Sequence, residues 1–165
     1  AELRQDMIGA CYGFYFLEMA AYYTQENMDG TEFLNLLYVS LKALLKPALD
    51  NRLVRRVYEL RMLVLSGEYP DVFSCAKCGR KQELYYFSVK CHGALCPECL
   101  KGEYAVPLDE STLYALQYIM TAPYQKLYSF TLTAPVFGRL EEIVSGYIHQ
   151  YHDRHFKSQE MLEHI

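Results

Sequence analysis

Two Cys-x-x-Cys pairs, Cys75/Cys78 and Cys96/Cys99, constrain the fold of this chain more than any other feature. Seventeen residues separate the pairs, a spacing typical of structural zinc sites with four thiolate ligands. Four thiolates that close a tetrahedron leave no coordination position for a substrate, so the pattern predicts one structural Zn²⁺ ion. The intervening stretch from Leu84 to Val89 is rich in strand-forming residues and favours a small β-hairpin.

Two neighbouring residues leave the ligand set open. Cys91 and His92 come just before the second pair, and either could replace one of its cysteines as a ligand. The chain has six cysteines, which could instead form disulfides in a secreted protein. No secretory leader is visible, so we expect reduced thiols in a cytoplasmic protein.

Patterns that carry catalysis are missing from the sequence. No His-x-Glu lies upstream of the cysteine pairs, as a zinc deaminase requires, and there is no P-loop or His-Glu-x-x-His. His149, His152 and His155 are spaced three apart near one helix face. They could bind a metal, but an exposed polar face is the favoured interpretation. We therefore expect a protein that is not an enzyme.

Helical periodicity dominates the rest of the chain. Apolar residues make up 52% of it, enough for a core, but no apolar run reaches the length of a membrane span. Helices are expected over 2–25, 31–45, 47–66, from 109 or 111 to 120, from a start signal at 131–135 to about 151, and in a short last helix capped by Ser158. The predicted fold is mostly α, a helical bundle-like domain with an inserted four-cysteine zinc ribbon or β-hairpin. The helical part spans 1–69 and 106–165, and the insertion spans 70–105.

The first of these helices is unusually apolar. Its stripe at helical spacing is formed by Leu3, Met7, Ala10, Phe14, Leu17 and Ala21. Further apolar side chains flank the stripe on both sides. The pattern predicts that this helix is central to the core.

Basic residues gather in two places, although the net charge of −4 argues against uniform coating by nucleic acid. The third helix carries Arg52, Arg55, Arg56 and Arg61, which form either a solvated helix face or a patch for phosphates or an acidic peptide. The zinc segment carries Lys77, Arg80, Lys81 and Lys90. These four residues motivate an alternative function, a zinc-ribbon regulator that grips a protein or duplex DNA; simple solubility is the favoured explanation for them.

Several segments, in order along nearly the whole chain, resemble the C-terminal part of the bacterial DNA repair and recombination protein RecO. They are YFLEM at 15–19, LRMLVLSGEYPD at 60–71, CAKCG at 75–79, FS at 87–88, GALCPEC at 93–99 and RHFKSQEML at 154–162. The Cys91-His92 pair departs from the usual zinc-loop pattern of that family. The resemblance implies a fragment that lacks the N-terminal OB domain.

In that family the full protein is a recombination mediator, found in the cytoplasm with the nucleoid. The resemblance implies that it acts with RecR and RecF to load RecA on single-stranded DNA coated by single-strand-binding protein, and that it anneals strands. The missing OB domain is the expected main platform for single-stranded DNA. The helical part is implicated in docking the acidic C-terminal tail of single-strand-binding protein. Candidate contacts are Arg154 and Lys157, within a matching segment, and Arg52, Arg55 and Arg56, by chemistry alone.

Overall fold

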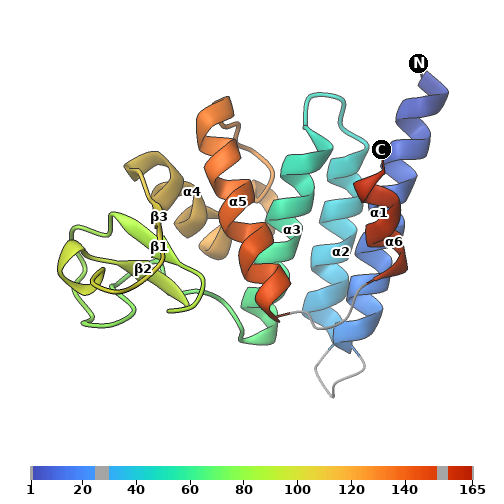
Figure 1. Cartoon of the computed structure of the whole chain (residues 1–165). Coiled ribbons are helices and arrows are strands. Elements are labelled where there is room, and N and C mark those ends of the chain that lie inside the picture. Colours follow the sequence, from blue (N-terminus) through green and yellow to red (C-terminus); the bar gives the residue numbers. More distant parts are fainter. Residues whose placement is uncertain (1, 25–29, 152–155, 165) are drawn as a thin grey trace.

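Helices form most of the fold, with one small sheet between the third and fourth helix (Figure 1). The computed structural model describes residues 2–24, 30–151 and 156–164, apart from the side chains of Tyr151 and Lys157. In these ranges there are six α-helices: α1 (Glu2–Thr24), α2 (Gly30–Leu44), α3 (Asn51–Ser66), α4 (Glu110–Thr121), α5 (Ala134–Tyr151) and α6 (Lys157–Glu163). Strands β1 (Tyr86–Ser88), β2 (Gly93–Leu95) and β3 (Val106–Pro107) form the sheet, and short 3₁₀ turns cover Pro97–Cys99 and Tyr124–Lys126. The predicted fold class is confirmed.

Capping residues set the ends of α3. The helix begins at Asn51 rather than at Pro47, because the Asp50 side chain accepts a hydrogen bond from the Arg52 backbone N–H at 2.9 Å. At the other end Gly67 adopts φ +80°, and its N–H bonds back to the carbonyls of Leu63 and Val64. A left-handed residue at this position is the usual way to end a helix, and glycine adopts it without strain.

The start of α6 differs from the prediction that Ser158 caps it. Phe156 holds the cap position, and Ser158 lies inside the first turn. The backbone N–H and the hydroxyl of Ser158 donate to the Glu18 carboxylate on α1, at 3.3 and 3.1 Å. A capping serine accepts a hydrogen bond from a backbone N–H, whereas here the hydroxyl and the backbone N–H of Ser158 both donate to a carboxylate of another helix.

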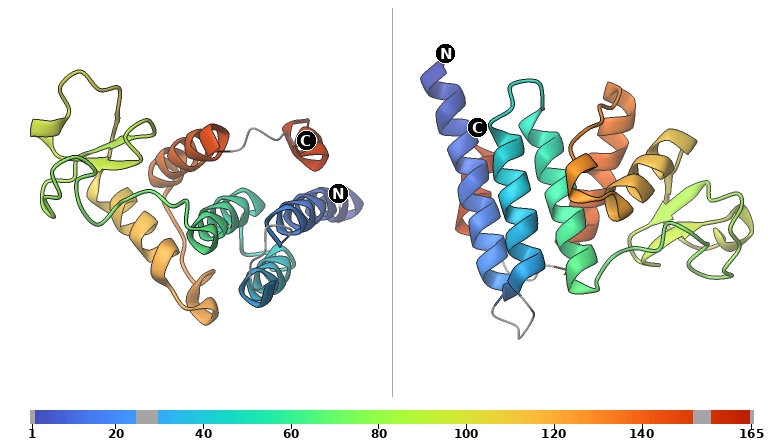
Figure 2. Two further views of the ribbon diagram at one scale, coloured as in Figure 1. Left: turned by 90° about the horizontal axis from the view of Figure 1, so that it is seen from below. Right: turned by 180° about the vertical axis from the view of Figure 1, so that it is seen from behind.

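The helices lie side by side, and α3 is the central one (Figures 1 and 2). It contacts α1, α2, α4 and α5, while α6 packs on α1. Phe16 of α1 stacks on Tyr58 of α3 with ring centroids 4.1 Å apart, and the Tyr58 hydroxyl donates to the Phe16 carbonyl at 2.7 Å. Each such fully buried side chain contributes about 1.5–3 kcal/mol to the free energy of unfolding. The core is therefore aromatic and is centred on α3.

The predicted inner face of α1 points to solvent. Leu3, Met7, Phe14 and Leu17 are 81%, 70%, 58% and 48% exposed, and Ala10 and Ala21 are exposed as well. The buried residues are Tyr12, Tyr15, Phe16, Met19, Ala20 and Tyr23. The expectation that this helix is central is wrong: α1 lies at the edge of the helical row (Figure 2). Among the described residues, no helix is both long enough and apolar enough to cross a membrane.

The sheet has the order β2-β1-β3, with both pairs antiparallel. Phe87 of β1 lies opposite Ala94 and Val106, and its ring meets Tyr147 of α5 edge-on at 6.3 Å. Gln117 of α4 donates to the Val72 carbonyl at 2.8 Å, which ties the segment before the sheet to the helices. The small sheet is thus joined to the helical body through α4 and α5.

One glycine allows the chain to close around the sheet. The backbone of Asp71 pairs with Gly93 in an isolated parallel bridge, and its N–H and carbonyl bond the neighbouring His92 carbonyl and Ala94 N–H at 2.9 and 2.8 Å. A Cβ at Gly93 would collide with the Asp71 backbone. Only glycine fits at this position without displacing the chain.

We predict that Gly93→Ala lowers the free energy of unfolding by about 1–3 kcal/mol, because the added methyl group has no room beside the Asp71 backbone. Urea denaturation followed by far-UV circular dichroism measures the effect. Gly138→Ala on α5 is the matched control, since nothing lies within 4 Å of its Cβ position and alanine favours helix by up to about 1 kcal/mol. Equal stability of the two variants would contradict the tight approach at Gly93.

Candidate metal centre and ion-pair network

The first cysteine pair lies in a tight turn at the start of the ribbon, the segment from Asp71 to Pro107. The Cys75 N–H donates to the Arg80 carbonyl at 2.7 Å, and the Gly79 N–H donates to the Cys75 carbonyl at 2.9 Å. Gly79 has φ +80°, the left-handed conformation that closes the turn. These bonds place the side chains of Cys75 and Cys78 on the same side of the turn.

The second pair follows β2 directly. Leu95 is the last residue of the strand, and Pro97 begins the 3₁₀ turn Pro97–Cys99, in which the Cys99 N–H donates to the Cys96 carbonyl at 3.1 Å. The Ala76 N–H donates to the Ala94 carbonyl at 2.8 Å, so the first turn is held against the strand that leads to the second. The two pairs are brought together by backbone hydrogen bonds.

The four thiols converge on one point. Their Sγ atoms all lie within 4.8 Å of one another, a group that could hold a metal ion, and the Sγ atoms of Cys78 and Cys96 are 3.7 Å apart. Zinc bound to four sulfurs at about 2.3 Å places those sulfurs about 3.8 Å apart. Cys75 and Cys96 are buried, while Cys78 is exposed. The distance between the Cys78 and Cys96 sulfurs agrees with that expected value, and the four thiols are close enough together to bind one ion.

The electrostatics of the thiols also fit a cation. Burial acts to raise the pKa of Cys75, but hydrogen bonds from the backbone of Cys78, Cys96 and Lys77 outweigh it and lower the pKa to about 6. Burial and the three neighbouring thiols raise the pKa of Cys99 to about 12. Four adjacent thiols cannot all ionise without a compensating charge. A divalent metal supplies that charge and keeps its ligands deprotonated.

Cys91 and His92 lie outside the group of four. They form the turn between β1 and β2, where the Cys91 N–H donates to the Ser88 hydroxyl at 3.1 Å. His92 has φ +64°, and its ring meets Tyr147 edge-on at 6.4 Å. Among the described residues, the group that could hold a metal consists of the two Cys-x-x-Cys pairs. Cys91 and His92 thus lie in the turn between β1 and β2 and are not part of this group.

Acidic partners neutralise part of the basic ribbon surface. Lys77 pairs with Glu103 at 2.6 Å. Arg80 pairs with Glu98 at 2.9 Å and with Glu83 at 3.5 Å. Lys81 and Lys90 are exposed. Two of the four basic residues named from the sequence thus face carboxylates of the ribbon itself.

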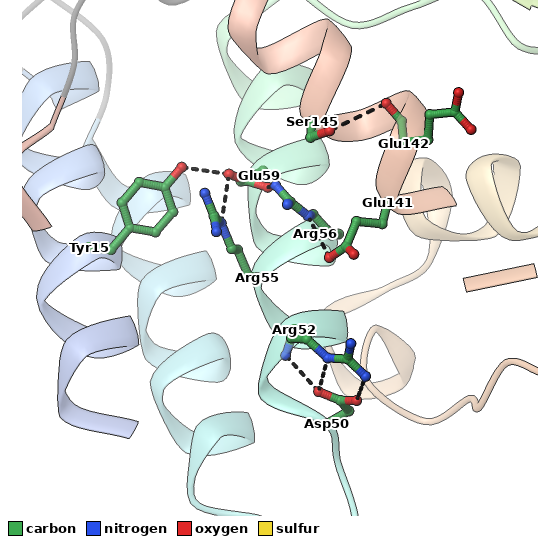
Figure 3. A network of polar contacts seen from close by, with 9 residues as sticks. All are labelled: Tyr15, Asp50, Arg52, Arg55, Arg56, Glu59, Glu141, Glu142 and Ser145. Carbon is green, nitrogen blue, oxygen red and sulfur yellow. Dashed lines mark hydrogen bonds and ion pairs between the residues drawn. The ribbon is translucent and has the colours of Figure 1, made fainter. Parts of the chain in front are cut away.

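The arginines of α3 belong mainly to a buried network around Glu59 (Figure 3). The Glu59 carboxylate, whose side chain is fully buried, pairs with Arg56 at 2.9 Å and Arg55 at 3.3 Å, and it accepts a hydrogen bond from the Tyr15 hydroxyl at 2.5 Å. Arg56 also reaches Glu141 of α5 at 3.3 Å. The network therefore joins α1, α3 and α5.

Both sequence-based interpretations of these arginines assumed exposed side chains. Those of Arg55 and Arg56 are only 14% and 10% exposed. Arg52 is 61% exposed and pairs with its neighbour Asp50 at 2.9 Å. Arg61 donates to the carbonyls of Ile119 and Ala122 at the end of α4. The structure thus does not bring the four together as one surface, and Arg52 is the member with a mostly exposed side chain.

The pKa of Glu59 shows which effect dominates in the network. Burial raises the pKa, but the charges of Arg56 and Arg55 and the hydrogen bond from Tyr15 outweigh burial, so that the net shift is downward. Burial and the Glu59 carboxylate raise the pKa of Tyr15 well above its usual value, which keeps its hydroxyl a donor. Glu59 is therefore ionised in the folded chain at neutral pH.

Comparison with known proteins gives the family. Residues 4–160 match the family described as "Recombination protein O C terminal". The chain belongs to this RecO C-terminal family.

Curated relatives agree with that assignment. The DNA repair protein RecO of Thermoanaerobacter sp. (strain X514) is 27% identical over 164 residues, which cover 99% of this chain and 66% of the relative. The DNA repair protein RecO of Bacillus subtilis (strain 168) is 24% identical over 162 residues, covering 98% and 63%. The chain spans about two thirds of the length of these relatives.

In this RecO-family chain, two predicted contact residues lie outside the part that the structure describes. Arg154 falls in 152–155, and the side chain of Lys157 is not described. Of the three spaced histidines, His149 is exposed on α5, and His152 and His155 fall outside the described residues.

Sequence reasoning missed the role of Glu59. The signal was present, because Glu59 follows Arg55 and Arg56 at the i+4 and i+3 spacings that bring side chains together on a helix. The spacing does not reveal that this face is buried. Asp71 was also missed: its carboxylate accepts hydrogen bonds from the N–H groups of Phe73 and Ser74 at 3.1 and 3.0 Å and orders the lead into the first cysteine pair.

Removal of the Glu59 charge should destabilise the fold strongly. We predict that Glu59→Gln lowers the free energy of unfolding by about 3–5 kcal/mol at pH 7, because it leaves buried arginines without their partner. Since the folded-state pKa of Glu59 is lowered, its contribution is present above the unfolded pKa and is lost as pH falls through the folded pKa. The difference between the native chain and the variant should therefore shrink in acid.

Urea denaturation of both chains between pH 7 and pH 3 measures this. Glu142→Gln is the control, because Glu142 forms an exposed pair with Arg139 at 2.7 Å and such pairs contribute at most about 1 kcal/mol. A Glu59→Gln chain as stable at pH 7 as the control would mean that the buried network is dispensable.

Proposed function

We propose that this chain is the helical and zinc-binding part of a RecO-type recombination mediator and that it works by binding partners rather than by catalysis. The match of residues 4–160 to the RecO C-terminal family carries this proposal. The relatives are DNA repair proteins by name. Within the proposed division, 1–69 and 106–165 form the helical part and 70–105 forms the zinc-binding insertion.

The proposed metal is one structural Zn²⁺ ion held by Cys75, Cys78, Cys96 and Cys99. Their Sγ atoms all lie within 4.8 Å of one another. The pKa of Cys75 is lowered and that of Cys99 is raised, and a bound cation would favour the thiolate form of both. When bound, the metal contributes folding free energy to a segment whose strands are only two or three residues long. A fully ligated ion has no open position for a reaction.

The proposed partners are those of a recombination mediator. The intact protein would act with RecR and RecF to load RecA on single-stranded DNA and would anneal strands, mainly through an N-terminal OB domain. The helical part would bind the acidic C-terminal tail of single-strand-binding protein. Arg154 and Lys157 are the proposed cations, and Arg52 is the exposed arginine of α3 that could join them.

The alternative, a regulator that grips its target through the ribbon, has weaker support. Lys77 and Arg80 face carboxylates of the ribbon itself, and this lowers the positive potential available to DNA or to an acidic protein. Lys81 and Lys90 remain its exposed cations. Charge changes at these positions separate the two proposals.

The metal proposal predicts one zinc ion per chain by elemental analysis. Cys75→Ser should weaken zinc binding by more than the roughly 10–100-fold that loss of an outer-shell partner costs, because it removes a buried ligand. Cys91→Ser is the matched control, since Cys91 lies outside the group of four thiols, and it should keep its zinc. Loss of zinc from the Cys91 variant together with retention by the Cys75 variant would overturn this ligand set.

The tail proposal predicts that a fluorescent peptide with the acidic C-terminal sequence of single-strand-binding protein binds the chain. Charge reversal by Arg154→Glu with Lys157→Glu should weaken binding at least about tenfold, and raised salt should weaken binding by the native chain. Lys81→Glu with Lys90→Glu is the control and should leave the affinity unchanged. Weakened binding in the ribbon variant alone would favour the alternative function.

A further inference from the structure

The outer face of α1 carries a regular apolar repeat. Leu3, Met7, Ala10, Phe14, Leu17 and Ala21, here called the α1 stripe, alternate spacings of four and three residues. This is the a/d repeat of a helix that packs along another helix. The stripe is about 27 Å long at 1.5 Å per residue. Its four large side chains are each about half or more exposed, so the repeat is not used inside the fold.

The opposite face of the same helix is already buried against α2, α3 and α6. A helix that is apolar on all sides is normally covered on all sides. Helix α1 lies at the outer edge of the helical row, as the left view of Figure 2, which looks along the helices, shows. This face is therefore as apolar as a protein interface, although it lies at the surface of the chain.

A groove of about 810 Å³ runs beside the stripe, between α1 and the end of α2. On the α1 side Gln5, Asp6 and Ile8 line one end of the groove, and the small residues Gly9, Ala10 and Gly13 line the rest; Leu41, Leu44 and Leu45 line its other side. Nothing lies within 4 Å of the Cβ position of Gly9. A large ring, Phe14, thus protrudes one turn away from a hollow that a large ring could fill.

We propose that the α1 stripe is a self-association surface, on which a second copy of this chain packs with its α1 antiparallel to the first. An antiparallel pair centred near Tyr12 places Met7 against Leu17 and Phe14 against Ala10 of the other copy. The same register sets Leu3 against Ala21. Each layer joins a large side chain to a smaller or equal one, and the Phe14 ring of each copy enters the hollow beside Ala10 of the other. Such a contact is self-complementary, as a two-fold interface requires.

Charge supports the same arrangement. No charged residue occurs between Met7 and Leu17, so the central layers carry none. Arg4 and Glu18 flank the stripe on one side, at its two ends. In the antiparallel pair Arg4 of each copy falls near Glu18 of the other, whereas in a parallel pair these two residues lie on opposite flanks of the seam and do not meet. Glu18 also accepts from Ser158, and a carboxylate has further acceptor sites for an arginine.

The size of the α1 stripe sets the expected affinity between the two copies. A seam of this length buries on the order of 1,000 Å² in total, which is at the low end for specific association. We therefore expect a reversible dimer with a dissociation constant in the micromolar range. The dimer would present two ribbons at its outer ends, because the ribbon lies at the end of the molecule opposite α1 (Figure 1).

Sedimentation equilibrium of the metal-loaded chain over a range of concentrations tests the proposal. Met7→Glu should raise the dissociation constant at least about 100-fold, because two carboxylates would be desolvated in each dimer. Tyr114→Glu is the control: it adds the same charge at an exposed position of helix α4 and should leave the dimer intact. Circular dichroism confirms that both variants keep their helices.

Cross-linking tests the direction of the pair. Equal amounts of a Met7→Cys chain and a Leu17→Cys chain, mildly oxidised, should give peptides that link position 7 to position 17. Links of 7 to 7 and 17 to 17 would overturn the antiparallel register. A native chain that stays monomeric at all concentrations would overturn self-association and assign the stripe to a different protein or to another segment of the longer protein.

Discussion

The Glu59 carboxylate is the point on which the helical arrangement depends. It is fully buried and holds Arg55, Arg56 and the Tyr15 hydroxyl, and Arg56 carries the connection on to Glu141 of α5. A buried ion pair does not by itself add much stability, since desolvation offsets its attraction. The buried ion pair nevertheless raises the free energy of every arrangement of the helices in which one of its charged groups lacks a partner. The network therefore selects one placement of α1, α3 and α5 among the many that aromatic packing alone would allow.

The ribbon is held by a different kind of interaction. Its strands are short, its turns are closed by backbone bonds, and its four thiols lie beside a small set of buried apolar residues that includes Phe87 and Leu95. It meets the helical body at Gln117 of α4 and Tyr147 of α5. A metal held by the four thiols would fix the two turns of the ribbon relative to each other.

Prediction from sequence succeeded where chemistry is local and failed where burial decides. The cysteine spacing indicated the four-thiol group, and periodicity indicated most of the helices. Pro47 was a good start signal, but Asp50 offered a better cap. Arg55 and Arg56 were read as surface residues, because charged residues are seldom buried. Only the fold shows that Glu59 and Tyr15 reach the same place.

The orientation of α1 shows how the choice between two apolar faces is made. Hydrophobicity alone cannot determine which face is buried, since both faces are rich in large apolar residues. Polar groups determine it instead, because the Tyr15 hydroxyl bonds to Glu59 and the Glu18 carboxylate bonds to the first turn of α6. Both hydrogen bonds orient α1 so that its buried residues, from Tyr12 to Tyr23, point inward. The α1 stripe contains no polar side chain that needs a hydrogen-bond partner, and it is left on the outside. The same few hydrogen bonds that define the core thus also create the exposed apolar surface of this chain.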